Sequence, residues 1–503
     1  MRAGMKVLIA NRGEIAVRVI RACREMGYPT VAVYSEPDRA ALHVVYSDQA
    51  LPIGPAPSRE SYLRIDRILD AAKKSGADAI HPGYGFLAEN ADFARACRDA
   101  GLLFIGPSPE SIDAMGSKTD ARSRMKAAGV PVVPGLIDPV KSFAEIEAFA
   151  REVGLPIMIK AAAGGGGKGL RLVQREEDLL SAFERVTSEA ESFFGDSAVY
   201  AEKFIASPRH VEVQIVGDQH GNIVHVGEGE CTLQRRHQKV VEECPSPVVD
   251  GELREQLGAM AVKAAAAVNY YSTGTIECLM GPDRQFYFLE MNTRLQVEHP
   301  VTEMVWGVDL VKEQLRIARG EKLSFTQQDL RRLGHAIECR IYAEDPSRKF
   351  APSPGLIRYI NLPEGPGVRN DQGVYPGYTV PVFYDPMLSK LIVHGQNRDE
   401  AIARMCRALA EYRVEGIMTT IPFFTVIMNN PEFRAGKFDT GFIDRILPEI
   451  DFTNRPATER HVDAAIAAAA IMAFEESQNV KLPVDEDSRW RQTARMEAVR
   501  GRL

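Results

Sequence analysis

The sequence predicts an α/β fold built from several domains, and three observations lead to this prediction. Short apolar stretches alternate with amphipathic helical stretches over residues 7–100, which is the rhythm of βαβ units. The composition, with 45% hydrophobic and 26% charged residues, is typical of a folded globular chain. The length of 503 residues corresponds to about three domains of ordinary size.

The N-terminal segment carries the clearest of these signals. Successive strands of βαβ units run parallel, so we expect a parallel sheet with helices on its faces. The expected strands are residues 7–10, residues 30–34 and one beginning at residue 79, and the expected helices are residues 15–26, 65–74 and 93–100. The Gly-Pro-Ser-Pro stretch of residues 106–109 ends the segment, because Gly and Pro interrupt regular structure.

A second α/β segment extends over about residues 116–334 and contains two hairpins. One pairs residues 211–216 with 223–226, and the other pairs residues 273–280 with 285–291. The connecting stretches are rich in Gly, Pro, Asp and Asn, which favour tight turns.

From residue 335 onward, short strands are separated by Pro and Gly, which indicates a β-rich, barrel-like domain closed by a helix at residues 398–413. The last part of the chain differs again. Residues 457–476 are rich in Ala and predict a helix with Thr458 as its N-cap. We expect an acidic loop at residues 480–488 and a short helix at residues 490–499.

Charge and cysteine usage exclude several classes of protein. The net charge of -7 and the absence of a basic cluster with interleaved aromatic residues disfavour nucleic-acid binding. The seven cysteines form no CxxC pair, which is typical of reduced thiols rather than a disulfide framework or a zinc site. No signal peptide and no apolar run of about 18 residues is present. We therefore expect a cytoplasmic protein without a membrane span.

Residues 160–169 form the Gly-rich stretch Lys-Ala-Ala-Ala-Gly-Gly-Gly-Gly-Lys-Gly, directly after an expected strand. Successive glycines let backbone N–H groups approach phosphate oxygens closely, and Lys160 and Lys168 flank them. The stretch is not a Walker A motif, because Gly169 stands where Ser or Thr is required. A phosphate-binding loop and a flexible surface loop both remain open.

The second hairpin carries a candidate metal site. If the four-residue turn sets the register, Glu277 lies near Phe288, and Glu277, Phe288 and Glu290 share one face. Two carboxylates on one face, with Asn292 at the strand end, offer the hard oxygen ligands that suit Mg2+ bound to nucleotide phosphates. A pair of solvated strand carboxylates is the alternative.

Arg294, Gln296 and Glu298 follow at alternate positions, so we expect them to project together from an extended strand. A guanidinium beside a carboxylate suits a small oxyanion with a removable proton, although a structural ion pair is the alternative. The basic stretch of residues 234–239 could neutralise a triphosphate or form a solvated face. His210 and the stretch at residues 81–86 are weaker candidates.

With these motifs in this order, the chain resembles the biotin carboxylase component of acyl-CoA and pyruvate carboxylases, within the ATP-grasp superfamily. The resemblance extends from residue 7 to about residue 447. The motifs on which the resemblance rests are IANRGEIA (9–16), HPGYGFLAEN (81–90), KAAAGGGGKGL (160–170), RHVEVQ (209–214), QRRHQKVVEE (234–243), EMNTRLQVEHPVTE (290–303), GHAIECRIYAEDP (334–346) and YDPMLSKL (384–391).

The resemblance implies a Rossmann-like N-terminal domain (residues 1–117), an ATP-grasp domain (118–333), a C-terminal biotin carboxylase domain (334–447) and a helical tail (448–503). It also implies roles for individual residues by motif match. ATP would be held by Lys118, Lys160, Gly165, Gly166, Gly167, Glu202, Lys203, Ile205, His210, Gln234, His237 and Leu279. Mg2+ or Mn2+ would be held by Glu277, Glu290 and Asn292; bicarbonate by Lys239, Arg294, Gln296, Glu298 and the backbone of Val297; and biotin by Tyr84 and Arg340.

In the reaction that this resemblance implies, Lys239, Arg294, Glu298 and Arg340 are the catalytic residues. Glu298 removes the bicarbonate proton, attack on the γ-phosphate gives carboxyphosphate, and its decomposition supplies CO2 to biotin, whose enolate Arg340 stabilises. A lid that excludes water would protect the carboxyphosphate.

The implied partners are a carboxyltransferase subunit, a biotinylated carrier protein and a second copy of the chain in a homodimer. No Ala-Met-Lys-Met tetrapeptide occurs, so we expect biotin to arrive on a separate chain. The final acceptor, whether acetyl-CoA, propionyl-CoA, another acyl-CoA or a keto acid, would be chosen by the carboxyltransferase. The tail resembles those of acetyl/propionyl-CoA-type subunits, and it could pack, dock a partner or remain a solvated appendage.

Two positions depart from the family pattern: Ala163 stands where a glycine is common, and Gly229 where an arginine is common. Two other functions compete with this one. One is a different ATP-grasp ligase that forms an acylphosphate, and the other is a non-catalytic nucleotide-binding regulator. The Arg294–Glu298 cluster and Arg340 argue against the first, and the competent residues at every catalytic position argue against the second.

Overall fold

The computed structural model describes residues 4–136, 140, 142–161, 170–194, 198–236, 238–452 and 459–478, with side chains for all of these except residues 118–119, 192–194, 459–463 and 476–478. They belong to two compact units divided after Ile450, and each unit is described by itself. None of the helices in this described part of the chain is both long and apolar enough to cross a membrane.

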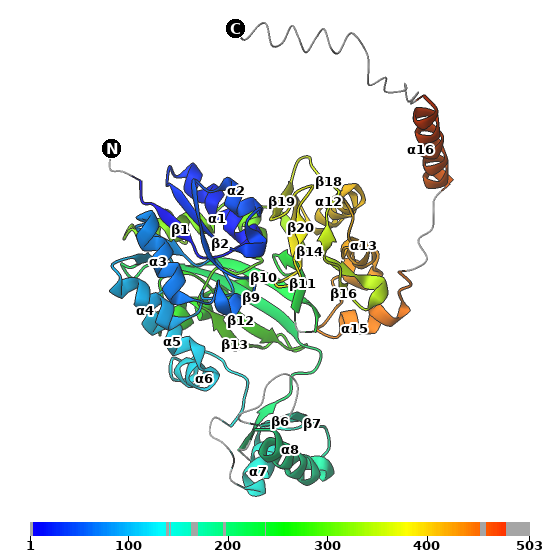
Figure 1. The fold of residues 1–503 in the computed structure, drawn as a ribbon. Helices are drawn as coiled ribbons and strands as arrows, with labels where there is room; N and C mark the ends of the chain where they lie inside the picture. The colour runs from blue at the N-terminus through cyan, green and yellow to red at the C-terminus, as the bar shows by residue number, and fades with distance from the viewer. Residues whose placement is uncertain are drawn as a thin grey trace, which may run out of the picture. The chain divides into compact units, whose positions relative to one another are not determined.

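The N-terminal region contains a five-stranded parallel sheet in the order β3-β2-β1-β4-β5 (Figure 1). The first strand lies in the middle of this order, as in doubly wound folds, so the Rossmann-like prediction is confirmed. Val7 and Ile9 of β1 pack with α1, whereas Leu8 faces the opposite side with Ile68 of α3 and Phe93 of α4. The elements are β1 (Val7–Ile9), α1 (Gly13–Glu25), β2 (Thr30–Ser35), α2 (Leu42–Tyr46), β3 (Gln49–Gly54), α3 (Ile65–Ser75), β4 (Ala79–His81), α4 (Ala91–Asp99), β5 (Leu103–Phe104) and α5 (Pro109–Gly116).

A small three-stranded antiparallel sheet, ordered β7-β6-β8, follows in the chain. Helices α7 and α8 pack against it through Phe149 and Val186, which contact Ile157 and Ile159 in one apolar cluster (Figure 1). The elements are α6 (Lys118–Ala127), α7 (Phe143–Val153), β6 (Ile157–Ala161), β7 (Leu170–Val173), α8 (Leu179–Phe194) and β8 (Val199–Lys203).

An eight-stranded antiparallel sheet, ordered β13-β12-β9-β10-β11-β14-β21-β19, forms the centre of the first unit. Both predicted hairpins lie in it. Strand alternation gives the sheet two different faces. On one face, Val211, Val213 and Ile276 pack into an apolar core with α9. Glu212 and Glu277 occupy alternate positions, so their buried carboxylates lie on the other face. The elements are β9 (Arg209–Gly217), β10 (Ile223–Arg235), β11 (Gln238–Cys244), α9 (Gly251–Ala266), β12 (Ser272–Met280), β13 (Phe286–Asn292), α10 (His299–Trp306) and α11 (Leu310–Ala318).

The C-terminal region is β-rich, as predicted, and three of its strands, β14, β21 and β19, continue the central sheet. This continuity brings β14 beside β11, so side chains of the two regions can meet. The predicted closing helix is α12. The elements are β14 (His335–Tyr342), β15 (Glu344–Asp345), β16 (Ala351–Pro352), β17 (Gly355–Leu356), β18 (Tyr359–Asn361), β19 (Val368–Gln372), β20 (Thr379–Val380), β21 (Met387–Gly395), α12 (Arg398–Glu411), β22 (Arg413–Glu415), α13 (Ile421–Asn429), α14 (Pro431–Arg434) and α15 (Phe442–Ile446).

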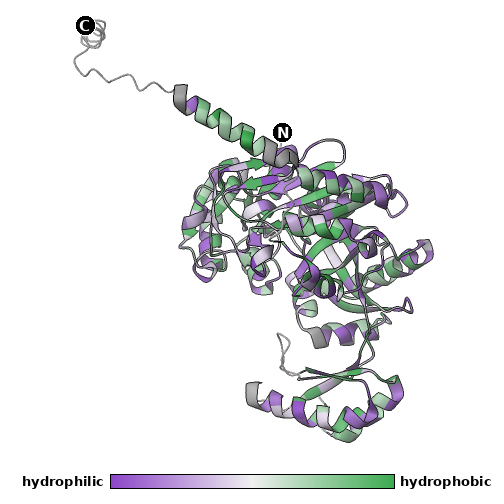
Figure 2. Ribbon diagram, turned by 90° about the vertical axis from the view of Figure 1, so that its right-hand side faces the viewer, coloured by the Kyte–Doolittle hydropathy of each residue, from purple (hydrophilic) through white to green (hydrophobic). Residues whose placement is uncertain are grey.

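The second unit contains α16 (Glu459–Gln478), which confirms the Ala-rich helix. Apolar residues occur along much of this helix (Figure 2), and Ile466, Ile471 and Met472 are each more than half exposed. The proposed cap Thr458, the loop at residues 480–488 and the helix at residues 490–499 lie outside the described residues.

Candidate active site

Lys239 of β11 lies at the centre of a buried group of carboxylates. Its Nζ donates to Glu212 Oε2 at 2.7 Å, Glu277 Oε1 at 2.9 Å and Glu298 Oε1 at 2.6 Å. The three acids come from β9, β12 and the start of α10, and each is buried. Three carboxyl groups thus share one ammonium, which cannot neutralise three ionised carboxylates. Burial, followed by the charge of Glu298, raises the pKa of Glu212 to about 8.

Arg340 of β14 approaches Glu298 from the other side. Its Nη2 lies 2.9 Å from Glu298 Oε2 and 2.6 Å from Glu242 Oε1. Burial opposes ionisation of Glu298, but Lys239 and Arg340 together outweigh it and hold the pKa of Glu298 below its usual value. Glu298 is therefore an ionised carboxylate that accepts hydrogen bonds from both Lys239 and Arg340.

The register of the β12–β13 hairpin differs from the predicted one. Glu277 pairs directly with Glu290, and Cys278 pairs with Phe288, because a β-bulge at Leu289 inserts one extra residue into β13. Phe288 therefore packs in the apolar core with Cys278, and the prediction that it shares a face with Glu277 is wrong. The bulge nevertheless brings the two carboxylates closer than predicted, because they are opposite rather than diagonal.

Oxygen atoms in this hairpin fit a hard divalent cation. Glu277 Oε1 accepts hydrogen bonds from Asn292 Nδ2 at 2.8 Å and Gln296 Nε2 at 3.1 Å. His210 Nε2 lies 3.0 Å from Glu277 Oε2, and His210, Glu212 and Glu277 form a group whose ligand atoms could surround one ion. Two facing carboxylates and the amide of Asn292 are the donor set that Mg2+ or Mn2+ prefers.

The stretch from Arg294 to Glu298 is not the extended strand that we predicted. It is irregular and turns into α10, because Glu298 occupies the N-cap position and Pro300 favours the first helical turn. The side chains nevertheless converge. Arg294 Nη1 donates to Gln296 Oε1 at 3.2 Å, and Arg294 Nη2 donates to Asn292 Oδ1 at 2.8 Å. The guanidinium of Arg294 thus lies beside Asn292 and Gln296, two of the residues expected to hold the metal and bicarbonate.

The expected nucleotide residues fall into two groups in the structure. On the small sheet, Lys160 is hydrogen-bonded to Glu202. Lys203 instead donates to the carbonyls of residues 153–155 at the end of α7, so its ammonium holds a helix terminus.

On the central sheet, Leu279 pairs with His210, and His210 Nδ1 lies 3.1 Å from Gln234 Nε2. Within the described ranges, no hydrogen bond or ion pair joins this group to Lys160 or Glu202. The side chain of Lys118, the glycines Gly165, Gly166 and Gly167, His237 and the departure at Ala163 lie outside the described residues.

A cavity of about 490 Å³ lies beside Arg294, Val297 and Arg340, and Tyr84 also lines it. Tyr84 donates a hydrogen bond to Glu14, and burial raises the pKa of Glu14 to about 7 against the opposing charge of Lys390. The two expected biotin residues, Tyr84 and Arg340, therefore line one cavity together with Arg294 and Val297, two of the residues expected to hold bicarbonate.

Asn11 shapes the loop that carries Tyr84. Its Nδ2 donates to the carbonyls of Pro82 and Tyr84, both at 2.7 Å. Gly83 has a φ of +64°, and a Cβ there would lie 2.9 Å from Asn11 Nδ2, so this position requires glycine. Asn11 and Glu14 both lie in the IANRGEIA motif (9–16), which predicted no role for either residue.

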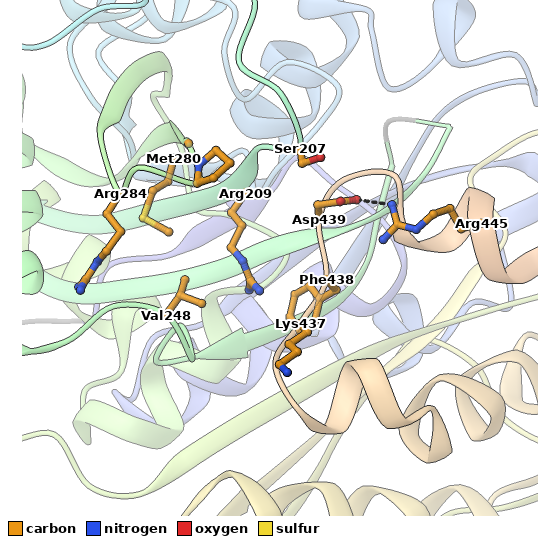
Figure 3. Close-up of a pocket in the computed structure, with 11 residues that line it drawn as sticks. Ser207, Arg209, Val248, Met280, Arg284, Lys437, Phe438, Asp439 and Arg445 are labelled. Atoms are coloured by element: carbon orange, nitrogen blue, oxygen red, sulfur yellow. Dashed lines mark hydrogen bonds and ion pairs between the residues drawn. The ribbon is translucent and has the colours of Figure 1, made fainter.

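A second cavity, of about 530 Å³, is lined by none of the bicarbonate, metal or biotin residues (Figure 3). The guanidinium of Arg209 lies 4.3 Å from the centre of the Phe438 ring, and Arg445 pairs with Asp439 at 2.7 Å. Arg209 precedes His210 on β9, so strand alternation directs it away from the nucleotide group.

Gly229 faces the carboxylate cluster. It pairs with Glu212 across β9 and β10, and a Cβ at Gly229 would lie 3.5 Å from Glu212 Cγ. A cationic side chain at this position would stand beside Glu212. With glycine here, Lys239 is the cation that contacts Glu212.

Comparison with protein families finds three matches along the chain. Residues 3–112 match the biotin carboxylase N-terminal domain, residues 117–326 the ATP-binding domain of the carbamoyl-phosphate synthase L chain, and residues 338–445 the biotin carboxylase C-terminal domain. Biotin carboxylase of Halalkalibacterium halodurans is 55% identical over 442 residues, which cover 88% of this chain and 98% of the relative. Biotin carboxylase 1 of Bacillus subtilis is 54% identical over 440 residues, or 87% and 98% of the two chains.

Solved structures show the same similarity. A biotin carboxylase complex with β-γ-ATP from Campylobacter jejuni has 47% identity and a TM-score of 0.81, covering 88% of this chain and 98% of that one. The biotin carboxylase domain dimer of Hydrogenobacter thermophilus 2-oxoglutarate carboxylase, in complex with MgADP, ADP and bicarbonate, has 47% identity and a TM-score of 0.82. It covers 90% of this chain and all of its own.

Proposed function

The chain belongs to the biotin carboxylase family, and we propose that the residues gathered around Lys239 and Arg340 carry that family's reaction in this chain. The enzyme uses ATP to activate bicarbonate and transfers the carboxyl group to biotin on a carrier protein. The observation that supports this site assignment most strongly is Glu298, an ionised carboxylate between Lys239 and Arg340.

Bicarbonate would bind beside Arg294 and Gln296, within reach of Lys239. As an anion, it competes with Glu298 for the N–H donors of Lys239 and Arg340. Each hydrogen bond that moves from Glu298 to bicarbonate raises the pKa of Glu298 and makes it a better base at the moment when a proton must be removed. The bicarbonate oxygen then attacks the γ-phosphate of ATP, and carboxyphosphate and ADP form.

The nucleotide would be held by two groups of residues, one on the small sheet around Lys160 and Glu202, and one on the central sheet around His210 and Gln234. Glu277, Glu290 and Asn292 would hold Mg2+ or Mn2+, which supplies positive charge to the phosphate oxygens when bound. The proposed nucleotide set is completed by Lys118, Lys203, Ile205, His237, Leu279 and the three glycines at 165–167.

Biotin would enter the cavity shared by Tyr84 and Arg340. Carboxyphosphate decomposes to CO2 and phosphate. The released phosphate can accept the biotin N1 proton, and the nitrogen then attacks CO2. The guanidinium of Arg340 can stabilise the enolate oxygen that results, because a charge-assisted hydrogen bond in a buried site is strong. Arg340 lines the same cavity as Arg294 and Val297, two of the proposed bicarbonate residues, which would keep CO2 near its acceptor.

The domain division at residues 1–117, 118–333, 334–447 and 448–503 belongs to this proposal, and the three family matches support it. We also propose two partner proteins, a carboxyltransferase subunit and a biotinylated carrier protein. The chain itself would assemble as a homodimer. A named dimer among the similar structures supports the last point. The final acceptor would be an acyl-CoA or a keto acid chosen by the carboxyltransferase.

ATP hydrolysis by the purified chain tests this function. We expect phosphate release to require bicarbonate and to increase with free biotin. Hydrolysis that requires bicarbonate but ignores biotin would favour a different ATP-grasp ligase that forms an acylphosphate. Hydrolysis that ignores both would refute the proposal.

A further inference from the structure

Two buried side chains hold successive backbone carbonyls immediately before α10. His299 Nδ1 lies 2.7 Å from the carbonyl oxygen of Gln296, and Lys390 Nζ lies 2.7 Å from the carbonyl oxygen of Val297. Both side chains are completely buried, with 0% exposure. They come from different elements, since His299 begins α10 and Lys390 lies in β21. Two successive carbonyls are thus held by buried donors.

The planarity of the peptide bond converts these contacts into an orientation. In a trans peptide unit the C=O and the N–H point in opposite directions. A bond to the Gln296 carbonyl therefore sets the direction of the Val297 N–H, and a bond to the Val297 carbonyl sets that of the Glu298 N–H. Within the described part of the chain, neither N–H donates a hydrogen bond to another residue. Val297 lines the cavity that contains Arg294 and Arg340.

The protonation of His299 follows from its partner. A carbonyl oxygen can only accept, so Nδ1 must carry the hydrogen. Burial, and then the nearby cations beginning with Lys390, hold the pKa of His299 well below its usual value, so the ring stays neutral. This tautomer leaves Nε2 facing Glu303, 4.0 Å away.

Lys390 also connects the loop to the biotin side of the cavity. Its Nζ lies 3.3 Å from Glu14 Oε1 and 5.7 Å from the centre of the Tyr84 ring. Lys390 and Arg340 are directly paired across β14 and β21. The buried Lys390 ammonium therefore contacts the carbonyl of Val297, and it lies beside Tyr84 and Arg340, the residues expected to hold biotin.

We propose that His299 and Lys390 are positioning residues that aim the N–H groups of Val297 and Glu298 at bicarbonate. The proposal rests on the proposed function, because it assigns the two N–H groups to the same bicarbonate. A site whose donors are fixed before the anion arrives spends no binding free energy on ordering them.

Two substitutions of His299 separate positioning from simple filling of space. The amide nitrogen of Asn lies near the position of Nδ1, whereas that of Gln lies near the position of Nε2. We expect H299N to keep a KM for bicarbonate close to that of the wild type. We expect H299Q to raise it by about tenfold or more, the usual cost of losing a bond that orients a binding group. The KM for ATP should stay unchanged in both.

Lys390 requires a second design, because K390M leaves Glu14 buried without its cation and could destabilise the fold. The double variant E14Q/K390M removes this uncompensated charge, and its thermal midpoint should exceed that of K390M. If Lys390 positions the loop, the KM for bicarbonate stays raised in the double variant although stability recovers. A return to the wild-type KM together with stability would show that Lys390 only stabilises the fold.

The outcomes also separate this inference from the proposed function. If the wild type shows no bicarbonate-dependent ATP hydrolysis, the function itself fails. If the wild type shows it, but H299N and H299Q have the same KM for bicarbonate, the function stands and the positioning role of His299 is refuted.

Discussion

Strand β11 carries a charged side chain near each end, the buried Glu243 and the 12%-exposed Lys239, and the two ends differ in how the charge is satisfied. Glu243 accepts hydrogen bonds from Arg398 Nε at 2.6 Å and Nη2 at 3.1 Å, and His335 Nε2 lies 2.7 Å away. At the other end, Lys239 faces three carboxylates. Burial alone therefore does not mark a functional site.

The difference lies in the balance of charge. At the Glu243 end, His335 and Arg398 outweigh the burial of Glu243 and hold its pKa below the usual value, so one carboxylate is matched by its donors. At the Lys239 end, four buried acids, Glu212, Glu242, Glu277 and Glu298, outnumber the cations Lys239 and Arg340 that contact them. Burial and the neighbouring Glu298 raise the pKa of Glu212 to about 8, because ionising all of these acids is costly unless a ligand compensates the charge. A divalent cation bound among these acids would supply that charge, and acids with pKa values shifted in this way are typical of functional sites.

The largest expected effect is a loss of catalytic rate on substitution at the Lys239 end of β11. We expect E298Q to lower kcat for bicarbonate-dependent ATP hydrolysis by about 10²–10⁴-fold, the usual contribution of a general base. ATP binding, measured by calorimetry, should persist, because Glu298 contacts Lys239 and Arg340 and not the expected nucleotide residues. R294A should show the same pattern. Normal turnover in either variant would contradict the site.

The matched substitution at the other end of β11 should affect stability instead. R398M removes the main donor to a buried carboxylate, so we expect a loss of about 3 kcal/mol in the free energy of unfolding. The kcat per folded molecule should not change. Denaturant titration with an activity measurement on the same sample checks both. A catalytic defect without a loss of stability would show that the two ends do not differ as described.

A smaller effect is expected at the metal ligands. E290Q removes one charged oxygen but keeps the size of the side chain. The Mg2+ concentration that gives half-maximal activity should rise by at least about tenfold. Because more Mg2+ can offset weaker binding, activity should recover at high Mg2+. A defect that no Mg2+ concentration relieves would place Glu290 outside the metal site.

The smallest effect is a pH dependence at the Glu243 end. The folded-state pKa of Glu243 lies below its usual value of 4.5. Its contribution to stability is therefore present above pH 4.5 and is lost as the pH falls through the folded-state pKa. R398M weakens this ionisation, so the stability gap between wild type and variant should shrink as the pH falls. A gap that stays constant down to acid pH would contradict the assignment.

Much of the fold follows from local pattern in the sequence. β1, β2 and β4 have apolar cores, and their helices have regular apolar spacing. β3 and β5 were not predicted. Pro52 interrupts the apolar residues of the edge strand β3, and β5 has only two residues. Neither offers an uninterrupted apolar run, on which strand prediction depends.

The site was less predictable from the residues alone. The bulge at Leu289 arises where Phe288 packs into the core, and such packing is invisible in a hairpin's sequence. Glu212 and Glu242 were missed, because an acid on a strand usually faces solvent. Arg340 contacts Glu298 because β14, which is distant in the sequence, pairs with β11. Such long-range pairing cannot be read from local sequence.

The fate of bicarbonate oxygen tests the central claim most directly. When ATP is hydrolysed in the presence of biotin and ¹⁸O-labelled bicarbonate, attack on the γ-phosphate leaves one bicarbonate oxygen in the released phosphate. We predict this label in phosphate from the wild type and from R398M, and its loss together with turnover in E298Q. Phosphate released by the wild type with oxygen from water alone would contradict the account.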